Sequence, residues 1–417
     1  MIDLVQLIIW TAYFISLYFV LFWLLTFVEK GIIEQEKKLK TYPSVTIALP
    51  AYNEEKNITR SIESVLSLNY PKELLQIIVI DDGSKDNTLS VIKELQKKHP
   101  HRITLIHHDQ NQGKGASLND AIKQANGDYF VCLDTDSEIE SNALLKMLPH
   151  FDEEDIAVVL PLMKVRTPET ILQKLQWCEY LLNFFYKSLM ARINCVHVAP
   201  GPFSVYRKKV LDDVGGFALN NLTEDFEVTL KLQKKHYRII QLLDTIVYTG
   251  TPETFHAFVK QRNRWYKGTL LNLYDYKTMI FNKKYGDFGM LQLPRVMLSG
   301  FLAVFFIFLT SWKYLLKPLS KKISHWSSIN FDLGVFLRKF SLHFSWIDLN
   351  YTNLFFGIIS FILSLIIINY AYHYTKEKVF RYGFISVPIY IVAYGLLASA
   401  VWLTVFADLL RGKKQRW

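Results

Sequence analysis

Residues 129–137 read YFVCLDTDS, in which five apolar or aromatic residues precede two carboxylates one residue apart. This pattern predicts a buried strand that stops at Asp134. On an extended backbone, residues i and i+2 point the same way, so Asp134 and Asp136 face one point in space. Two carboxylates there suit Mg²⁺ or Mn²⁺, which could also hold a diphosphate. A solvated turn after a strand explains this stretch equally well when it is taken alone.

Three similar apolar runs precede this one, at residues 44–49, 75–80 and 103–107, and helical patterns separate them. Strands that alternate with helices predict an α/β domain with a mostly parallel, doubly wound sheet. Ligands of such sheets bind beyond the carboxyl ends of the strands. The polar loops at those ends, residues 50–55, 81–88, 111–115 and 134–136, are therefore expected to share one site.

The composition points to a membrane protein. Half of the 417 residues are hydrophobic although 21% are charged, and the net charge is +10. The apolar residues gather in runs long enough to cross a bilayer, at residues 4–27, 290–312, 354–372 and 384–410. Basic residues flank these runs, which favours a membrane surface over nucleic acid as the partner of the positive charge.

The first run is expected to be a retained anchor rather than a signal peptide, because no basic leading region and no small-residue cleavage site accompany it. The lysines after it place the following domain in the cytoplasm. An amphipathic stretch at residues 331–346 could be an interfacial or a re-entrant helix, and the side of the C-terminal tail depends on the number of full crossings. Three full crossings put the basic tail outside, and one re-entrant segment returns it to the cytoplasm.

Two segments, residues 171–193 and 255–273, mix aromatic and basic side chains. Such helices commonly lie at a membrane interface. Ordinary helices that pack on the sheet are the alternative. Cys132, Cys178 and Cys195 have no metal-ligand spacing and are expected to be reduced packing residues.

Several polar motifs carry chemistry. Asp81 and Asp82 end a strand, where a carboxylate can bind a base edge or ribose hydroxyls. Lys114 lies between two glycines at a helix start and could meet a phosphate, although an exposed turn lysine is equally consistent. Asp225 opens a helix, where it could accept the proton of an attacking hydroxyl. Arg264 could bind a diphosphate, and Trp265 could stack on a sugar ring.

Together these residues resemble the membrane-integrated family 2 glycosyltransferases that make cellulose, chitin, hyaluronan and poly-β-1,6-N-acetylglucosamine. The resemblance covers roughly residues 43–270 and is carried by an ordered set of motifs. The set is Pro50-Ala-Tyr-Asn-Glu-Glu55, Asp81-Asp82-Gly-Ser, Asn111-Gln-Gly-Lys114, Asp134-Thr-Asp136, Gln176-x-x-Glu179-Tyr180, Gly201-Pro-Phe-Ser-Val-Tyr-Arg207, Thr223-Glu-Asp225 and Gln261-x-x-Arg264-Trp265.

The resemblance implies a GT-A fold and an inverting, metal-dependent transfer from a UDP-sugar. It implies that Asp225 is the general base and that Asp134 and Asp136 hold the metal–diphosphate unit, with Asp136 as the stronger metal ligand. The remaining implied residues bind ligand. The residues implied to bind the nucleotide sugar are Tyr52, Glu54, Asp81, Asp82, Lys114 and Asp134. Those implied to bind the diphosphate or the acceptor are Gln261, Arg264, Trp265, Glu224, Gly201 and Pro202.

The expected protein is a processive polymerase of a UDP-sugar, with UDP-N-acetylglucosamine favoured because the chain's size and single leading span resemble the poly-N-acetylglucosamine enzymes. The expected division is an anchor at 1–28, a cytoplasmic catalytic domain at 29–250, interface helices at 251–287 and a membrane region at 288–417. A homo-oligomer or accessory subunit could complete a channel. The alternatives are an enzyme that adds one sugar to a lipid and, more remotely, an inactive membrane scaffold.

Overall fold

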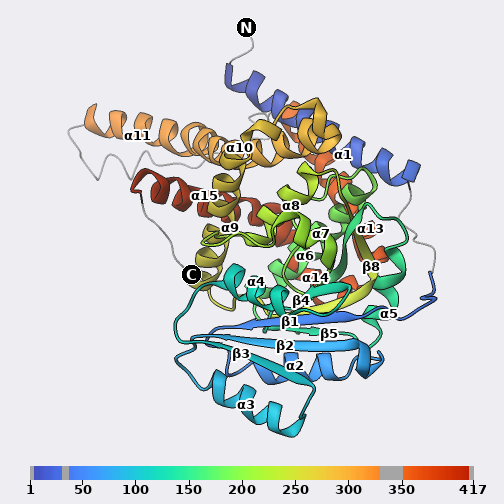
Figure 1. Cartoon of the computed structure of the whole chain (residues 1–417). Coiled ribbons are helices and arrows are strands. Elements are labelled where there is room, and N and C mark those ends of the chain that lie inside the picture. The colour runs from blue at the N-terminus through green and yellow to red at the C-terminus, as the bar shows by residue number, and fades with distance from the viewer. Residues whose placement is uncertain (1–3, 31–36, 329–350, 413–417) are drawn as a thin grey trace.

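The fold is built on one eight-stranded sheet, seen in a computed structural model that describes residues 4–30, 37–328 and 351–412 (Figure 1). The strand order is β3-β2-β1-β4-β7-β6-β8-β5. The strands are β1 Val45–Ala51, β2 Leu75–Asp82, β3 Ile103–His108, β4 Tyr129–Cys132, β5 Ser137–Ile139, β6 Ile156–Val165, β7 Ser204–Arg207 and β8 Arg238–Thr249.

The first half of the sheet is parallel, as the sequence pattern predicts. β1 pairs in parallel with β2 and β4, and β2 pairs in parallel with β3. The second half is mixed, because β7 runs antiparallel to both β4 and β6, and β5 runs antiparallel to β8. The α/β prediction is confirmed, and the parallel half is the part whose carboxyl ends carry the polar loops.

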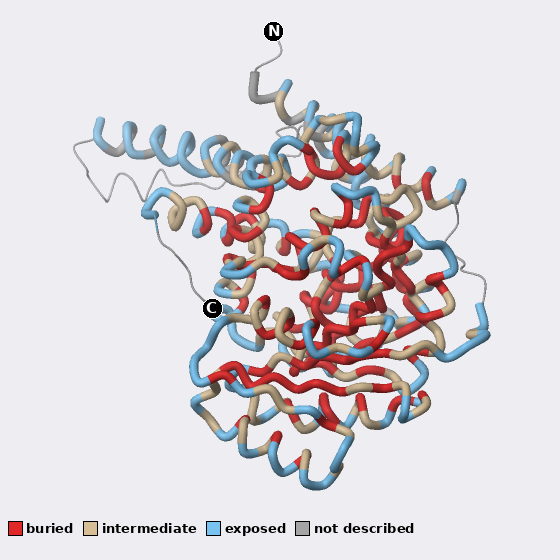
Figure 2. The backbone as a smooth tube through the Cα atoms, in the orientation of Figure 1, coloured by how far each residue is buried: buried red, intermediate tan, exposed pale blue. Residues whose placement is uncertain are grey.

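Helices cover both faces of the parallel half because its strands are apolar on both faces. Alternate residues of β1, such as Ile47 and Leu49, contact α2 (Ile58–Leu66) and α3 (Thr88–Lys98) within one core cluster. The intervening Ala48 lies in a second cluster with residues of α4 (Lys114–Gln124). Burial is therefore concentrated along the sheet, which is mostly red in Figure 2.

One long helix, α6 (Ile171–Arg192), separates the sheet from the apolar helices. A capping box between Thr170 and Gln173 starts it. It packs on β6 and β8 on one side and on α13 (Tyr351–Tyr374) and α14 (Val379–Ile389) on the other. This aromatic and basic segment therefore packs on the sheet, and apolar helices form a further layer on its other side.

The second aromatic and basic segment forms α9 (Phe255–Asp275), which packs on α15 (Gly395–Leu410), on α10 (Leu293–Ser311) and on the short α8 (Glu224–Lys234). The remaining helices are α5 Ala143–Met147, α7 Lys208–Val214 and α11 Lys317–Ser328. The three cysteines are free and buried, as expected.

The apolar runs at both ends of the chain form helices. The first is α1 (Leu4–Lys30). Within the described ranges, two helices are long and apolar enough to cross a membrane, at Leu354–Tyr374 and Arg381–Leu410, and a shorter apolar helix covers Tyr13–Glu29. Further crossings stay a prediction. The stretch at 331–346 lies outside the described residues.

The second of these helices is interrupted. Pro388 lies inside α14, and a π-helical turn at Tyr390–Tyr394 joins α14 to α15. Proline removes one backbone donor and crowds the preceding turn, so a local widening of the helix is expected there.

The connection between α13 and α14 is tied to the sheet. The buried Lys164 of β6 donates to the carbonyl oxygen of Thr375 at 2.8 Å and pairs with Glu377 at 3.0 Å. The loop between the two candidate membrane helices therefore contacts the sheet directly.

Candidate active site

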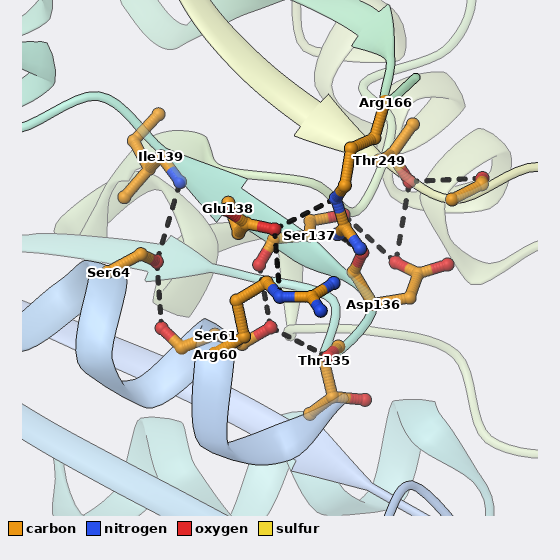
Figure 3. A network of polar contacts seen from close by, with 11 residues as sticks. Arg60, Ser61, Ser64, Thr135, Asp136, Ser137, Glu138, Ile139, Arg166 and Thr249 are labelled. Carbon is orange, nitrogen blue, oxygen red and sulfur yellow. Dashed lines mark hydrogen bonds and ion pairs between the residues drawn. The ribbon is translucent and has the colours of Figure 1, made fainter. Parts of the chain in front are cut away.

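The loop that leaves β4 is held by its backbone (Figure 3). The Ser61 hydroxyl of α2 lies 2.6 Å from the carbonyl oxygens of both Thr135 and Ser137. From the end of β6, Arg166 donates to the carbonyl oxygen of Asp136 at 2.6 Å and pairs with Glu138 at 2.8 Å. These contacts fix the path of the backbone between the two carboxylates.

The Asp136 side chain accepts hydrogen bonds from two hydroxyls, those of Ser137 at 2.9 Å and Thr249 at 3.4 Å. Burial and the nearby Asp134 raise the pKa of Asp136. Burial also raises the pKa of Glu54, and the charges of Asp136 and Asp134 add to that rise. Negative charge is therefore crowded here, which a bound cation would relieve.

Lys114 brings distant motifs together. Its ammonium lies 2.6 Å from Asp134 and 3.2 Å from Glu224, which opens α8. Burial lowers the pKa of Lys114, but these carboxylates outweigh burial and leave it well above its usual range. A Cβ on Gly201 would lie 2.4 Å from the Lys114 Nζ and 2.5 Å from an Asp134 oxygen, so only glycine leaves room for this ion pair.

Asp225 follows Glu224 on the first turn of α8 and is partly exposed. Its Oδ1 accepts the backbone N–H of Phe226 at 2.8 Å. Burial and the charge of Glu224 raise the pKa of Asp225 to about 6, although Lys114 and Arg264 oppose that rise. A carboxylate with this pKa is ionised near neutral pH and is basic enough to accept a proton.

The two carboxylates at the end of β2, Asp81 and Asp82, have different hydrogen-bond partners. Both oxygens of Asp82 are engaged, one by His108 at 2.8 Å and by the N–H of Gln112, the other by the N–H of Gly113. Asp81 contacts His107 through one oxygen at 2.8 Å. Its other oxygen is buried and has no hydrogen-bond partner within the described part of the chain.

The loop that holds Tyr52 and Glu54 is tied to the loop after β2. The Asn53 N–H donates to the Ser84 hydroxyl at 3.0 Å, and the Asn53 side chain accepts the Lys85 N–H at 2.8 Å. Tyr52 keeps 37% of its surface exposed. Tyr52 directly follows Ala51, whose partner across the two strands is Asp81. An exposed aromatic ring at this point is suited to a nucleobase.

Residues 261–265 approach the same region from α9. Arg264 donates to the carbonyl oxygen of Leu222 at 3.3 Å, directly before the turn that carries Glu224 and Asp225. A Cβ on Gly268 would lie 2.5 Å from the Thr223 hydroxyl, so α9 and the start of α8 are in close contact. The structure thus brings this motif beside the predicted base.

Sequence reasoning missed the residues that support the site. Ser61, Arg166 and Thr249 hold the loop of Asp134 and Asp136, yet none belongs to a recognisable motif. The only available signal was Arg166 directly after a fully buried strand, a charged residue where the chain turns at the sheet edge.

The comparisons with known proteins agree with this geometry. Residues 46–215 match the model of glycosyl transferase family 2. The chain carries a family 2 glycosyltransferase domain. The resemblance predicted from its motifs is confirmed, and the protein is a glycosyltransferase with that domain between its apolar helices.

Two relatives are polysaccharide synthases by name. The chain is 28% identical over 373 residues to the poly-β-1,6-N-acetyl-D-glucosamine synthase of Staphylococcus epidermidis, across 89% of this chain and 84% of that protein. It is 33% identical over 226 residues to the synthase of the same name from Staphylococcus aureus strain COL, across 54% of each chain.

A solved structure shows the same fold. The mannosyltransferase PcManGT from Pyrobaculum calidifontis, in complex with GDP-mannose and Mn²⁺, aligns with a TM-score of 0.58 and 17% identity, across 80% of this chain and 93% of that one. At this identity the match concerns the fold alone, and it confirms the predicted GT-A class. The ligand roles of the individual residues stay predictions.

Proposed function

We propose that this family 2 chain is a processive inverting β-glycosyltransferase that polymerises UDP-N-acetylglucosamine at the cytoplasmic face of a membrane. The observation that carries the proposal is the meeting of Lys114 with Asp134 and Glu224 under Gly201. Four motifs that are far apart in the sequence supply these residues. The two synthases named above support the choice of sugar and of a polymeric product.

The donor would lie across the carboxyl ends of β1, β2 and β4. Tyr52, Glu54 and the free oxygen of Asp81 would bind the nucleoside, whereas Asp82 would shape the loop that carries Lys114. Lys114 now pairs with Asp134 and Glu224, and a diphosphate would offer it a further anionic partner.

Asp134 and Asp136 fit a divalent cation, because two neighbouring carboxylates whose negative charges repel one another are stabilised by it. No cluster of three or more potential metal-binding side chains occurs in the described ranges, so the diphosphate and water would complete the ligands. Bound Mg²⁺ or Mn²⁺ would supply positive charge to the departing diphosphate.

The transfer itself would use Asp225 as the base. Its carboxylate takes the proton of the acceptor hydroxyl while that oxygen attacks the anomeric carbon. The bond from that carbon to the diphosphate oxygen breaks, and UDP leaves with the electron pair. Gln261, Arg264, Trp265, Gly201 and Pro202 would hold the diphosphate and the acceptor.

The chain divides, in this proposal, into the four segments expected from its sequence, with breaks near residues 28, 250 and 287. The apolar helices would pass the product outward. A cavity of about 300 Å³ supports a path among them, and its lining mixes apolar side chains with hydroxyls from Tyr186, Ser364, Tyr390 and Tyr394. An oligomer or accessory subunit could widen this path.

Incubation of the membrane-embedded protein with radiolabelled UDP-N-acetylglucosamine and Mg²⁺ or Mn²⁺, followed by sizing of the product, tests the proposal. A ladder of long chains is expected. A single-sugar glycolipid would instead identify the enzyme that adds one sugar to a lipid, and no UDP release with any UDP-sugar would identify an inactive scaffold.

A further inference from the structure

An ion pair connects α6 with α9 in the interior. Arg262 is fully buried and pairs through its Nη2 with Glu179, which is itself nearly buried. Glu179 belongs to a sequence motif that the proposed reaction does not use. A charge buried in this way is unfavourable unless it is well paired, so both side chains are needed together.

Arg262 also contacts two residues of the motif that is predicted to bind the acceptor. Its Nη1 donates to the Gln261 Oε1 at 2.6 Å, and its guanidinium lies 4.1 Å from the centre of the Trp265 ring. The ring of Phe258 lies 5.1 Å from the guanidinium. One planar group thus contacts Glu179, Gln261 and Trp265 at once.

These contacts have a direct chemical consequence. Because Arg262 occupies the amide oxygen of Gln261, the Gln261 NH₂ is the end that remains to donate to a sugar hydroxyl or a phosphate oxygen. Because the guanidinium stacks on Trp265, it fixes the plane of the ring. An ammonium in its place could pair with Glu179 but could not make the fork and the stack together.

The rest of α9 is held from another side. Asn263 donates to the Thr404 hydroxyl of α15 at 2.8 Å, and Tyr266 stacks on Trp402 at 4.6 Å between ring centres. These contacts fix the helix as a body. The contacts to α15 do not involve Arg262, so its loss is expected to disturb the side chains that it contacts more than the position of α9.

We propose that Glu179 and Arg262 form a positioning pair that presents the Gln261 amide and the Trp265 ring to the acceptor sugar. This inference rests on the acceptor role given to Gln261 and Trp265 in the proposed function. It assigns the pair to acceptor binding and not to donor binding.

The test uses the full chain in nanodiscs with two variants, Arg262→Lys and the double variant E179Q/R262M, which removes both charges and leaves none buried alone. Lys260→Met, an exposed change on the same helix, is the matched control. Transfer to a short β-1,6-linked N-acetylglucosamine oligosaccharide, release of UDP and affinity for UDP are measured.

Both variants are expected to lose about 10- to 100-fold in transfer, since small misplacements of binding groups have effects of this size. The KM for the oligosaccharide should rise, more UDP should be released per sugar transferred, and UDP affinity should stay within about twofold of wild type. Wild-type transfer in both variants, or an equal loss of UDP affinity, would overturn the proposal.

A second measurement does not depend on activity. Acrylamide quenching of Trp265 is obtained as the difference between each protein and its Trp265→Phe form. Loss of the covering guanidinium should raise the quenching of this tryptophan in E179Q/R262M, and unchanged quenching overturns the positioning role. If wild type transfers no sugar, the proposed function fails. The quenching measurement still tests whether Glu179 and Arg262 position the Trp265 ring.

Discussion

Two strand ends in this protein look alike in sequence and differ in structure. The carboxylates Asp81 and Asp82 end β2, and Asp134 and Asp136 follow β4, at the same edge of the sheet. Asp82 is saturated by a histidine and two backbone N–H groups. Asp134 instead pairs with the ammonium group of Lys114 at 2.6 Å.

The difference lies in what holds each loop. After β2 the carboxylate itself holds the following loop, so its lone pairs are used for structure. After β4 the backbone is held by Ser61 and Arg166, so the two carboxylates are not needed to hold this loop. A strand-end acid therefore becomes available for chemistry when other residues take over the work of fixing its loop.

The largest loss of turnover is expected from a change to the predicted base, which lies near the carboxylates that follow β4. Asp225→Asn should lower turnover by about 10²- to 10⁴-fold, the usual contribution of a general base. UDP affinity should persist, because the amide keeps the shape of the side chain. Release of UDP and calorimetric binding of UDP are measured on the same preparation, and undiminished turnover would remove Asp225 from this role.

The pH dependence of wild type checks the same residue. The base works when ionised, and the pKa of Asp225 is raised to about 6. The rate should therefore fall as the pH drops below about 6 and level off above it. A rate that stays constant down to pH 5 would speak against Asp225.

Asp136→Asn comes next and tests whether the β4 pair serves a ligand. Turnover should fall by about 10²- to 10³-fold, comparable with the loss of one group that stabilises transition-state charge. The melting temperature should stay the same or rise, since the raised pKa of Asp136 means that its charge is unfavourable in the fold. Asp109→Asn, an exposed acid directly after β3, is the control and should leave both quantities unchanged.

A smaller effect should separate the two members of the β2 pair. Asp82→Asn should destabilise the fold by about 1–3 kcal/mol, because it leaves buried partners of the carboxylate unsatisfied. Asp81→Asn should weaken UDP binding about tenfold with little change in stability, as expected for one lost charge-assisted hydrogen bond. Denaturation and UDP titration of both variants decide this, and a reversed pattern would contradict the division of roles.

The smallest effect is expected from the clamp on the β4 loop. Arg166→Met removes the donor to the Asp136 carbonyl and should lower turnover about tenfold or less, through positioning alone. Arg60→Met is the matched control, because Arg60 pairs with the same Glu138 at 3.4 Å and its side chain is half exposed. Equal losses in both variants would assign the effect to Glu138 rather than to the clamp.

Much of the parallel half could be predicted from local sequence. Apolar runs of four to eight residues followed by polar loops predict β1 to β4, and the edge at which these loops meet follows from parallel pairing. The mixed half could not be predicted in this way. β5 and β7 have only three and four residues, and their partners are chosen by contacts far along the chain.

The sequence by itself determined the inventory of this protein: an α/β domain, its acidic strand ends, its glycine-flanked lysine and its apolar flanks. These features are local, because a period of two, a turn residue or an apolar run needs no knowledge of distant partners. Only the tertiary structure decided which acid is saturated and which is open, and that Arg262 contacts Glu179, 83 residues away. Such choices depend on which side chains the fold brings within hydrogen-bond distance.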